Sequence, residues 1–186
     1  MMTALEELRK RLAGHLHAAD ISGLCRMAEG REGDGMKAAL FSLVGDGERR
    51  VASNALWVFS RFKAPERRWL QARQEELIDM AIAAPDVTSR RLVLTLLEHQ
   101  TFAADAIRTD FLDVCFGRML SDDEPVSIRS LSMKLAYKMC RHYPELLEEL
   151  RMSIAMIDAA AAESAGLRSC RRNILRQMEK GGSGKG

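Results

Sequence analysis

Four segments that begin with arginine recur along this chain, and their regular spacing limits its possible folds more than any other feature. They start at Arg50 (RVASNALW), Arg90 (RRLVLTLL), Arg129 (RSLSMKLA) and Arg168 (RSCRRNIL). The intervals between these arginines are 40, 39 and 39 residues. Self-similarity at such a period is typical of chains built from stacked copies of one small structural unit. The sequence therefore predicts a repeat protein.

Apolar residues occupy the same places in each segment. They are Ala52, Leu92, Leu131 and Cys170 two places after the arginine, Leu56, Leu96, Leu135 and Ile174 six places after it, and Trp57, Leu97, Ala136 and Leu175 seven places after it. Intervals of four and one put these side chains on one stripe of a helix, whereas a strand would alternate apolar and polar residues. Each segment is predicted to be one half-buried helix.

Prolines and acids mark where further helices begin. Pro65 and Pro144 each stand 15 residues after a repeat arginine, each is followed by glutamate, and Asp105 occupies that offset in the repeat between them. Proline in the first turn together with an acidic residue is typical of a helix start. Pro85 and Pro125, with aspartates beside them, mark other starts in the same way. Each repeat is therefore predicted to be a pair of helices.

The expected fold is all-α. Helix pairs are predicted over residues 36–44 with 47–62, 65–83 with 87–100, 104–120 with 125–141, and 144–160 with 164–179. An opening helix starts at a capping box formed by Thr3 and Glu6, and a short helix over residues 21–29 precedes the turn GREGDG. Such small units bury their apolar faces only by stacking, which predicts a right-handed α-solenoid, or α-α superhelix, of about four pairs.

We expect this solenoid to be a single domain over residues 1–180. Residues 1–30 are expected to form an N-terminal helical cap, residues 36–180 the repeats, and residues 181–186 (GGSGKG) a flexible tail.

Two of the repeated segments resemble a known family. DGERRVASNAL and DEPVSIRSLSMKLA, with the repeat period, resemble HEAT or armadillo-type repeats across about residues 36–180. VASNALWVF and SLSMKLAYKM, followed by HYPELLEEL, resemble short bacterial HEAT-like proteins of unassigned function. Some such sequences are labelled adenylosuccinate lyase, an enzyme whose catalytic loop resembles Ser-Ser-x-Met-Pro-x-Lys-x-Asn. This sequence has no Ser-Ser pair and no Met-Pro pair, so we reject that label.

Composition and charge are those of a globular chain. Of its 186 residues, 47% are apolar and 29% are charged. The formal net charge of +2, from 28 basic and 26 acidic residues, predicts no strong overall field toward nucleic acid or anionic lipid. Glu6 and Glu7 stand where a secretory signal has its uncharged core, and the longest uncharged run is too short to span a bilayer. We expect a cytoplasmic protein without membrane contact.

Residues that could carry chemistry do not form recognisable sites. The four cysteines, Cys25, Cys115, Cys140 and Cys170, are far apart and are interpreted as reduced core thiols. Two small groups contain zinc-ligand residue types, namely His15, His17 and Cys25, and Cys140 with His142, but neither reaches four ligands at a known spacing. We therefore expect no catalytic residue, no metal and no cofactor, and hence no enzyme.

Basic residues near the C-terminus provide the main local signal for a partner. They are Arg168, Arg171, Arg172 and Arg176 in the last predicted helix. They are interpreted either as a solvated helix end or as a docking surface for an acidic protein segment or a phosphate backbone. A second candidate is Arg67, Arg68 and Trp69, where the indole could stack on a ligand.

The sequence favours a non-enzymatic interaction or scaffold module for an unidentified protein, and nucleic-acid binding is the alternative. HEAT-like DNA glycosylases cradle DNA on a basic inner surface, but the corresponding stripe here is not continuously basic. It reads Val51, Ala55, Arg91, Thr95, Ser130, Lys134, Ser169 and Asn173. An armadillo-like peptide receptor would present a ladder of asparagines, whereas Asn54 is matched by Leu94, Met133 and Arg172.

Overall fold

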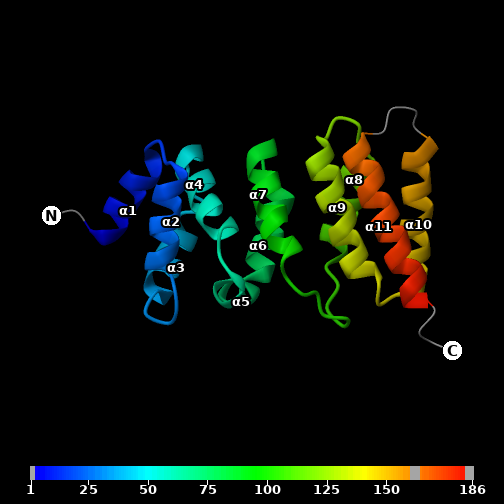
Figure 1. Ribbon diagram of the computed structural model, residues 1–186, viewed down its shortest axis with the longest axis horizontal. Coiled ribbons are helices and arrows are strands. Elements are labelled where there is room, and N and C mark those ends of the chain that lie inside the picture. The colour runs from blue at the N-terminus through cyan, green and yellow to red at the C-terminus, as the bar shows by residue number, and fades with distance from the viewer. Residues whose placement is uncertain (1–2, 160–163, 183–186) are drawn as a thin grey trace. The chain divides into compact units, whose positions relative to one another are not determined.

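The computed structural model describes residues 3–159 and 164–182, with side chains through 157 in the first range and through 180 in the second. Over these residues it contains eleven helices and no strand (Figure 1). The helices are α1 Ala4–Ala13, α2 Ala18–Met27, α3 Asp34–Ser42, α4 Arg49–Ser60, α5 Ala64–Gln71, α6 Gln74–Ala83, α7 Val87–Glu98, α8 Thr109–Leu120, α9 Val126–Cys140, α10 Pro144–Ala159 and α11 Ala165–Gly182. The predicted all-α fold class is confirmed.

The helices group into two compact units, Met1–Met80 and Ala81–Gly186. In the first unit α4 contacts α1 and α2, and α1 also contacts α3. In the second unit α9 contacts α7, α8, α10 and α11, and α8 contacts α10. The second helices of successive pairs are thus neighbours in this unit, and α9 and α11 lie side by side (Figure 1). The single domain expected over residues 1–180 stays a prediction.

The repeated apolar stripe is the core of these helices. The residues six places after each repeat arginine, Leu56, Leu96, Leu135 and Ile174, are 2%, 3%, 0% and 3% exposed. Their burial confirms the register of the repeat. Burial is less uniform at the other stripe positions, where four residues are only half-buried: Ala52, Trp57, Leu131 and Leu175.

Several predicted helix starts are confirmed. Thr3 and Glu6 form the capping box of α1, with the Glu6 amide donating to Thr3 Oγ1 at 3.2 Å. Asp86 caps α7 by accepting from the amides of Thr88 and Ser89 at 2.9 and 3.0 Å. These side chains provide acceptors for amides that a helix start leaves without an internal partner.

The helix predicted over residues 65–83 was wrong in one respect, because it is interrupted between α5 and α6. The Arg73 amide bonds to the carbonyl of Leu70 at 2.9 Å instead of reaching Trp69 four residues back. The Arg73 guanidinium takes over that carbonyl, with Nη1 3.3 Å from Trp69 O, and its Cζ lies 3.4 Å from the centre of the Trp69 ring. The side chain thus satisfies the carbonyl that the interrupted helix leaves open.

The predicted helix start near Asp105 was also wrong, because α8 begins at Thr109. The segment before it is held by side chains that come later in the chain. Lys138 donates to the carbonyl of Gln100 at 3.0 Å, and the Tyr143 hydroxyl donates to the carbonyl of Ala104. The carbonyls of Gln100 and Ala104 thus have donors without helical hydrogen bonds.

The last helix extends beyond its predicted end at residue 179, since α11 includes Gly181 and Gly182. The remainder of the expected flexible tail, residues 183–186, lies outside the described residues.

Two of the repeat arginines donate hydrogen bonds to main-chain carbonyls at the end of the first helix in their own pair. Arg129 Nε donates to the carbonyl of Met119 at 3.1 Å, near the end of α8, and Nη1 lies 2.9 Å from Asp122. Arg90 Nη1 likewise donates to the carbonyl of Ala84, directly after α6, at 3.5 Å, and its Nε forms an ion pair with Glu124 of the next helix pair at 3.2 Å. The recurrence of arginine in these repeats therefore has a structural reason, since cationic donors suit the C-terminal end of a helix.

Candidate partner-binding site

An open pocket of about 330 Å³ lies in the second unit, formed by α9, α11 and the C-terminal end of α7. We call it the α9–α11 pocket. It is built on the second helices of successive pairs, so its position follows from the way in which these helices pack side by side. Its lining residues are Glu98, Lys134, Tyr137, Lys138, Arg141, Cys170, Asn173, Ile174 and Gln177.

One side of the pocket is basic. Lys134 and Lys138 lie in the second half of α9 and Arg141 directly follows its last residue, and intervals of four and three residues put them on one helix face. Glu98 is the one carboxylate among the lining residues. Three cations against one carboxylate give this pocket a local surplus of positive charge, although the whole chain is nearly neutral.

The two lysines are held differently. The Lys134 ammonium lies 3.6 Å from the Glu98 carboxylate, and its side chain is 45% exposed. Lys138 donates instead to the main-chain carbonyls of Glu98 and Gln100. Burial lowers the pKa of Lys138, while the nearby Glu98 carboxylate opposes that shift. Lys134 is therefore the more available of the two for an anionic partner.

The α11 side of the pocket is partly apolar and partly amide. Cys170 and Ile174 are buried, whereas Asn173 and Gln177 are exposed. Burial raises the pKa of the Cys170 thiol, whose sulfur lies 3.6 Å from the carbonyl of Ser130. Because a thiol with a raised pKa is largely protonated at neutral pH, Cys170 is suited to packing and not to nucleophilic chemistry.

The C-terminal arginines lie next to this amide face. Arg168, Arg172 and Arg176 are exposed, and their spacing of four residues lays them along one stripe of α11. Asn173 and Gln177 directly follow two of these arginines. We call Arg168, Arg172 and Arg176 the α11 arginine stripe.

Arg171 is placed differently from its neighbours. It is 8% exposed and lies on the buried side of α11, with Ile174 and Met178. The structure therefore brings three of the four C-terminal arginines together on a surface and puts the fourth in the interior.

The second sequence candidate lies in the first unit, on α5. Arg68 is exposed, whereas Arg67 and Trp69 are half-buried. The Trp69 ring stacks on Phe59, with a centroid distance of 6.2 Å and an interplanar angle of 10°, and Arg73 lies over its face. Trp69 is thus engaged in packing within its own unit, which limits its use as a stacking platform for a ligand.

Lys138, Arg141 and Gln177 were not among the candidate site residues predicted from the sequence. Lys134 and Asn173, which occupy equivalent positions in their repeats, both line the pocket. The intervals of four and three residues from Lys134 to Arg141 were the available signal, since they identify one face of α9.

In the part of the chain that the structure describes, no helix is long and apolar enough to cross a membrane. Within the same residues, histidine, cysteine and acidic side chains form no group of three or more that could hold a metal ion.

The sequence was also compared with known proteins. A family model described as a HEAT repeat domain matches residues 8–178. No curated protein matches the sequence.

Proposed function

Because the chain belongs to the HEAT repeat family, we propose that it is a non-enzymatic interaction module whose protein partner presents an acidic segment. HEAT repeats are generally protein-interaction scaffolds. In such proteins the stacked helices create extended surfaces on which a partner binds.

The observation that carries this proposal is the concentration of positive charge on α9 and α11. The basic side of the α9–α11 pocket and the α11 arginine stripe belong to two helices in direct contact. Arginine and lysine side chains at such a surface can pair with carboxylates, and arginine can do so with two parallel hydrogen bonds. An acidic segment therefore complements this surface in charge.

The amides of Asn173 and Gln177 favour a polypeptide as the partner. Each amide side chain carries both a donor and an acceptor, so it can pair with the N–H and the C=O of a peptide backbone. The Glu98 carboxylate in the same pocket can accept a hydrogen bond from a peptide N–H. These features support an acidic peptide over nucleic acid.

The test measures binding of a fluorescent glutamate-rich peptide by anisotropy. We expect the wild-type chain to bind it, and R172E/R176E to lose most of that affinity, because both replaced side chains are exposed members of the α11 arginine stripe. The matched control is R31E/R50E, which makes the same change in net charge at two exposed arginines of the first unit. We expect this control to bind as the wild type does.

A glutamine-rich peptide and a DNA duplex serve as competing probes. Equal binding of the glutamine-rich peptide would contradict the role of charge. Tighter binding of the duplex, with an affinity that falls steeply as salt rises, would replace the proposal by nucleic-acid binding, since each neutralised phosphate releases counterions. Equal loss of peptide binding in both double variants would show only a general charge effect and would overturn the assignment to α11.

A further inference from the structure

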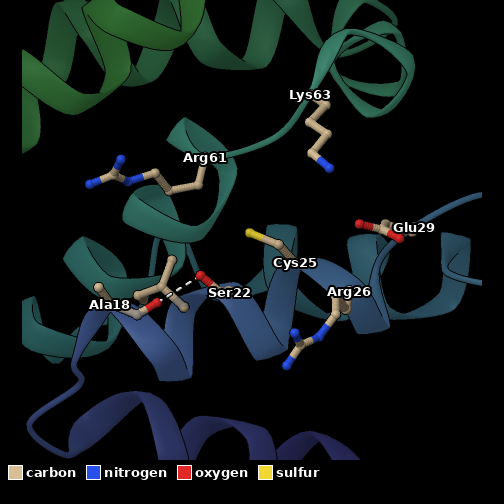
Figure 2. A pocket seen from close by; sticks show the side chains of 8 residues that line it. Ala18, Ser22, Cys25, Arg26, Glu29, Arg61 and Lys63 are labelled. Atoms are coloured by element: carbon tan, nitrogen blue, oxygen red, sulfur yellow. Dashed lines mark hydrogen bonds between the residues drawn. The ribbon is translucent and has the colours of Figure 1, made fainter.

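The first unit contains an open pocket of about 460 Å³ between α2 and the turn that joins α4 to α5. Three cations line it, Arg26, Arg61 and Lys63. Their charged groups point in different directions (Figure 2), so they do not converge on one anionic group. The second unit presents a more continuous surface, on the exposed side of α10.

Two exposed methionines lie next to each other on α10. Met152 is 59% exposed and Met156 is 66% exposed, more than any other large apolar side chain in the part of the chain that the structure describes. Because they are four residues apart, they are neighbours on the helix surface. Methionine side chains are flexible and polarisable, which suits them to surfaces that receive the apolar side chains of a partner.

The packing of α10 does not require methionines at these positions. Its buried apolar side chains lie on the opposite side of the helix: Leu150, Ile154 and Ile157. One repeat earlier, at an interval of 39 residues, the places of Met152 and Met156 are taken by Asp113 and Gly117 of α8, and both are exposed. These places thus belong to the surface in both repeats, and the last repeat carries an apolar pair there.

Two carboxylates extend the same stripe toward the N-terminal end of α10. Glu145, Glu149, Met152 and Met156 stand at intervals of four, three and four residues, and all four are exposed. They form one line along the helix, about 16 Å long, which we call the α10 ridge. Neither carboxylate of the ridge forms an ion pair with a described residue, whereas Glu148, beside it, pairs within the helix.

From this arrangement we propose that the α10 ridge docks a basic amphipathic helix of a partner protein. A helix with side chains at the same intervals can lay two apolar residues on Met152 and Met156 and two lysines or arginines beside Glu145 and Glu149. The partner supplies the counterions that the two carboxylates lack among the described residues. This surface is separate from the α9–α11 pocket and the α11 arginine stripe, so the proposal does not rest on the acidic partner proposed for them.

Helix dipoles set the direction of the partner helix. Glu145 and Glu149 lie toward the N-terminal end of α10. Cationic side chains are favoured near the C-terminal end of their own helix, where the last carbonyls carry partial negative charge. The partner helix therefore runs antiparallel to α10, and its apolar pair precedes its basic pair in sequence.

The test uses a fluorescein-labelled helical peptide with two leucines followed by two lysines at intervals of four, three and four residues. We expect the wild-type chain to bind this lysine peptide, measured by anisotropy. A peptide with glutamates in place of the lysines should bind at least about tenfold more weakly, because two ion pairs become two repulsive contacts. A peptide with the lysine pair before the leucine pair should also bind more weakly.

Two double variants separate the parts of the ridge. M152Q/M156Q removes the apolar contact and E145Q/E149Q removes the charge, and each should weaken binding of the lysine peptide about tenfold. All four side chains are exposed, so both variants should melt near the wild-type temperature. The charge reversal E145K/E149K should restore binding to the glutamate peptide.

Matched controls lie in the first unit. M27Q makes the same replacement at a methionine that is 53% exposed, and E7Q/E32Q removes the same charge at two exposed glutamates. Both should bind the lysine peptide as the wild type does. M152Q/M156Q should in turn still bind the glutamate-rich peptide of the α11 arginine stripe, so that failure of one proposal is distinguished from failure of the other.

The proposal is overturned if the lysine peptide does not bind the wild type, if the glutamate peptide binds as tightly, or if either ridge variant retains wild-type affinity. Equal binding of the two lysine peptides would overturn the antiparallel arrangement. Methionine-dependent binding of vesicles that contain phosphatidylserine, without binding of the lysine peptide, would replace the partner helix by a membrane surface.

Discussion

The Lys138 ammonium donates a hydrogen bond to the main-chain carbonyl of Glu98, which lies 40 residues earlier, one repeat back along the chain. It also donates to the carbonyl of Gln100. Both carbonyls lie at or just beyond the C-terminal end of α7, where helical hydrogen bonds run out. Asn54 does the same in the first unit, donating to the carbonyl of Leu12 at 2.7 Å. Both side chains thus bond to carbonyls at the C-terminal end of a helix that comes earlier in the chain.

Lys138→Met should lower the free energy of unfolding by about 1 to 2 kcal/mol, because it leaves two part-buried carbonyls without their donor while keeping an unbranched apolar side chain. Chemical denaturation measures this change. The control is Lys134→Met, which loses only a partly exposed ion pair with Glu98 and should cost less than about 1 kcal/mol. Equal losses in the two variants would contradict the capping role of Lys138.

Leu96→Ala and Leu135→Ala should each lower the free energy of unfolding by about 2 to 5 kcal/mol, the range for truncation of a leucine in a packed core. Both residues occupy the buried stripe position of their repeats. Leu5→Ala removes the same atoms from a residue that is 44% exposed and should change stability by less than about 0.5 kcal/mol. Wild-type stability of both core variants in urea titrations would disprove the repeat register.

Arg171→Glu should destabilise the protein by at least about 2 kcal/mol, because it places a carboxylate in a buried environment that accommodates a cation. Arg172→Glu makes the identical replacement one residue later on the exposed surface and should leave the melting temperature nearly unchanged. Calorimetric melting compares the two. If Arg171→Glu melted with the wild type, the buried placement of Arg171 would be wrong.

Acid should weaken the start of α8. A hydrogen bond from Arg108 lowers the pKa of Asp110 from its ordinary value of 3.8 to about 2. A carboxyl group with a lowered folded-state pKa contributes stability above its unfolded pKa, and this contribution is lost as the pH falls from 3.8 toward 2. The melting temperatures of the wild type and Asp110→Asn should therefore converge across that interval. A gap that stays constant down to pH 2 would argue against this pair.

Part of the candidate site could be predicted from the sequence. The exposed arginines at 168, 172 and 176 stand out as a basic group at helical spacing. The burial of Arg171 could not be predicted from this spacing. Intervals of three and four residues show which side chains share a helix face, but they do not show which face the other helices cover. The role of Lys138 could not be predicted for another reason. Its hydrogen-bond acceptors are main-chain carbonyls at the end of α7, which are far from Lys138 in the sequence.

The sequence by itself determined the repeat period, the apolar stripe and most helix starts. These features depend on residues that stand next to one another or one turn apart, so helical geometry and capping chemistry suffice to predict them. Tertiary structure decided the non-helical segment before Thr109 and the pocket between α9 and α11. Each depends on side chains that meet only after the helices have packed, and no local pattern specifies which carbonyl or ring a long side chain will then reach.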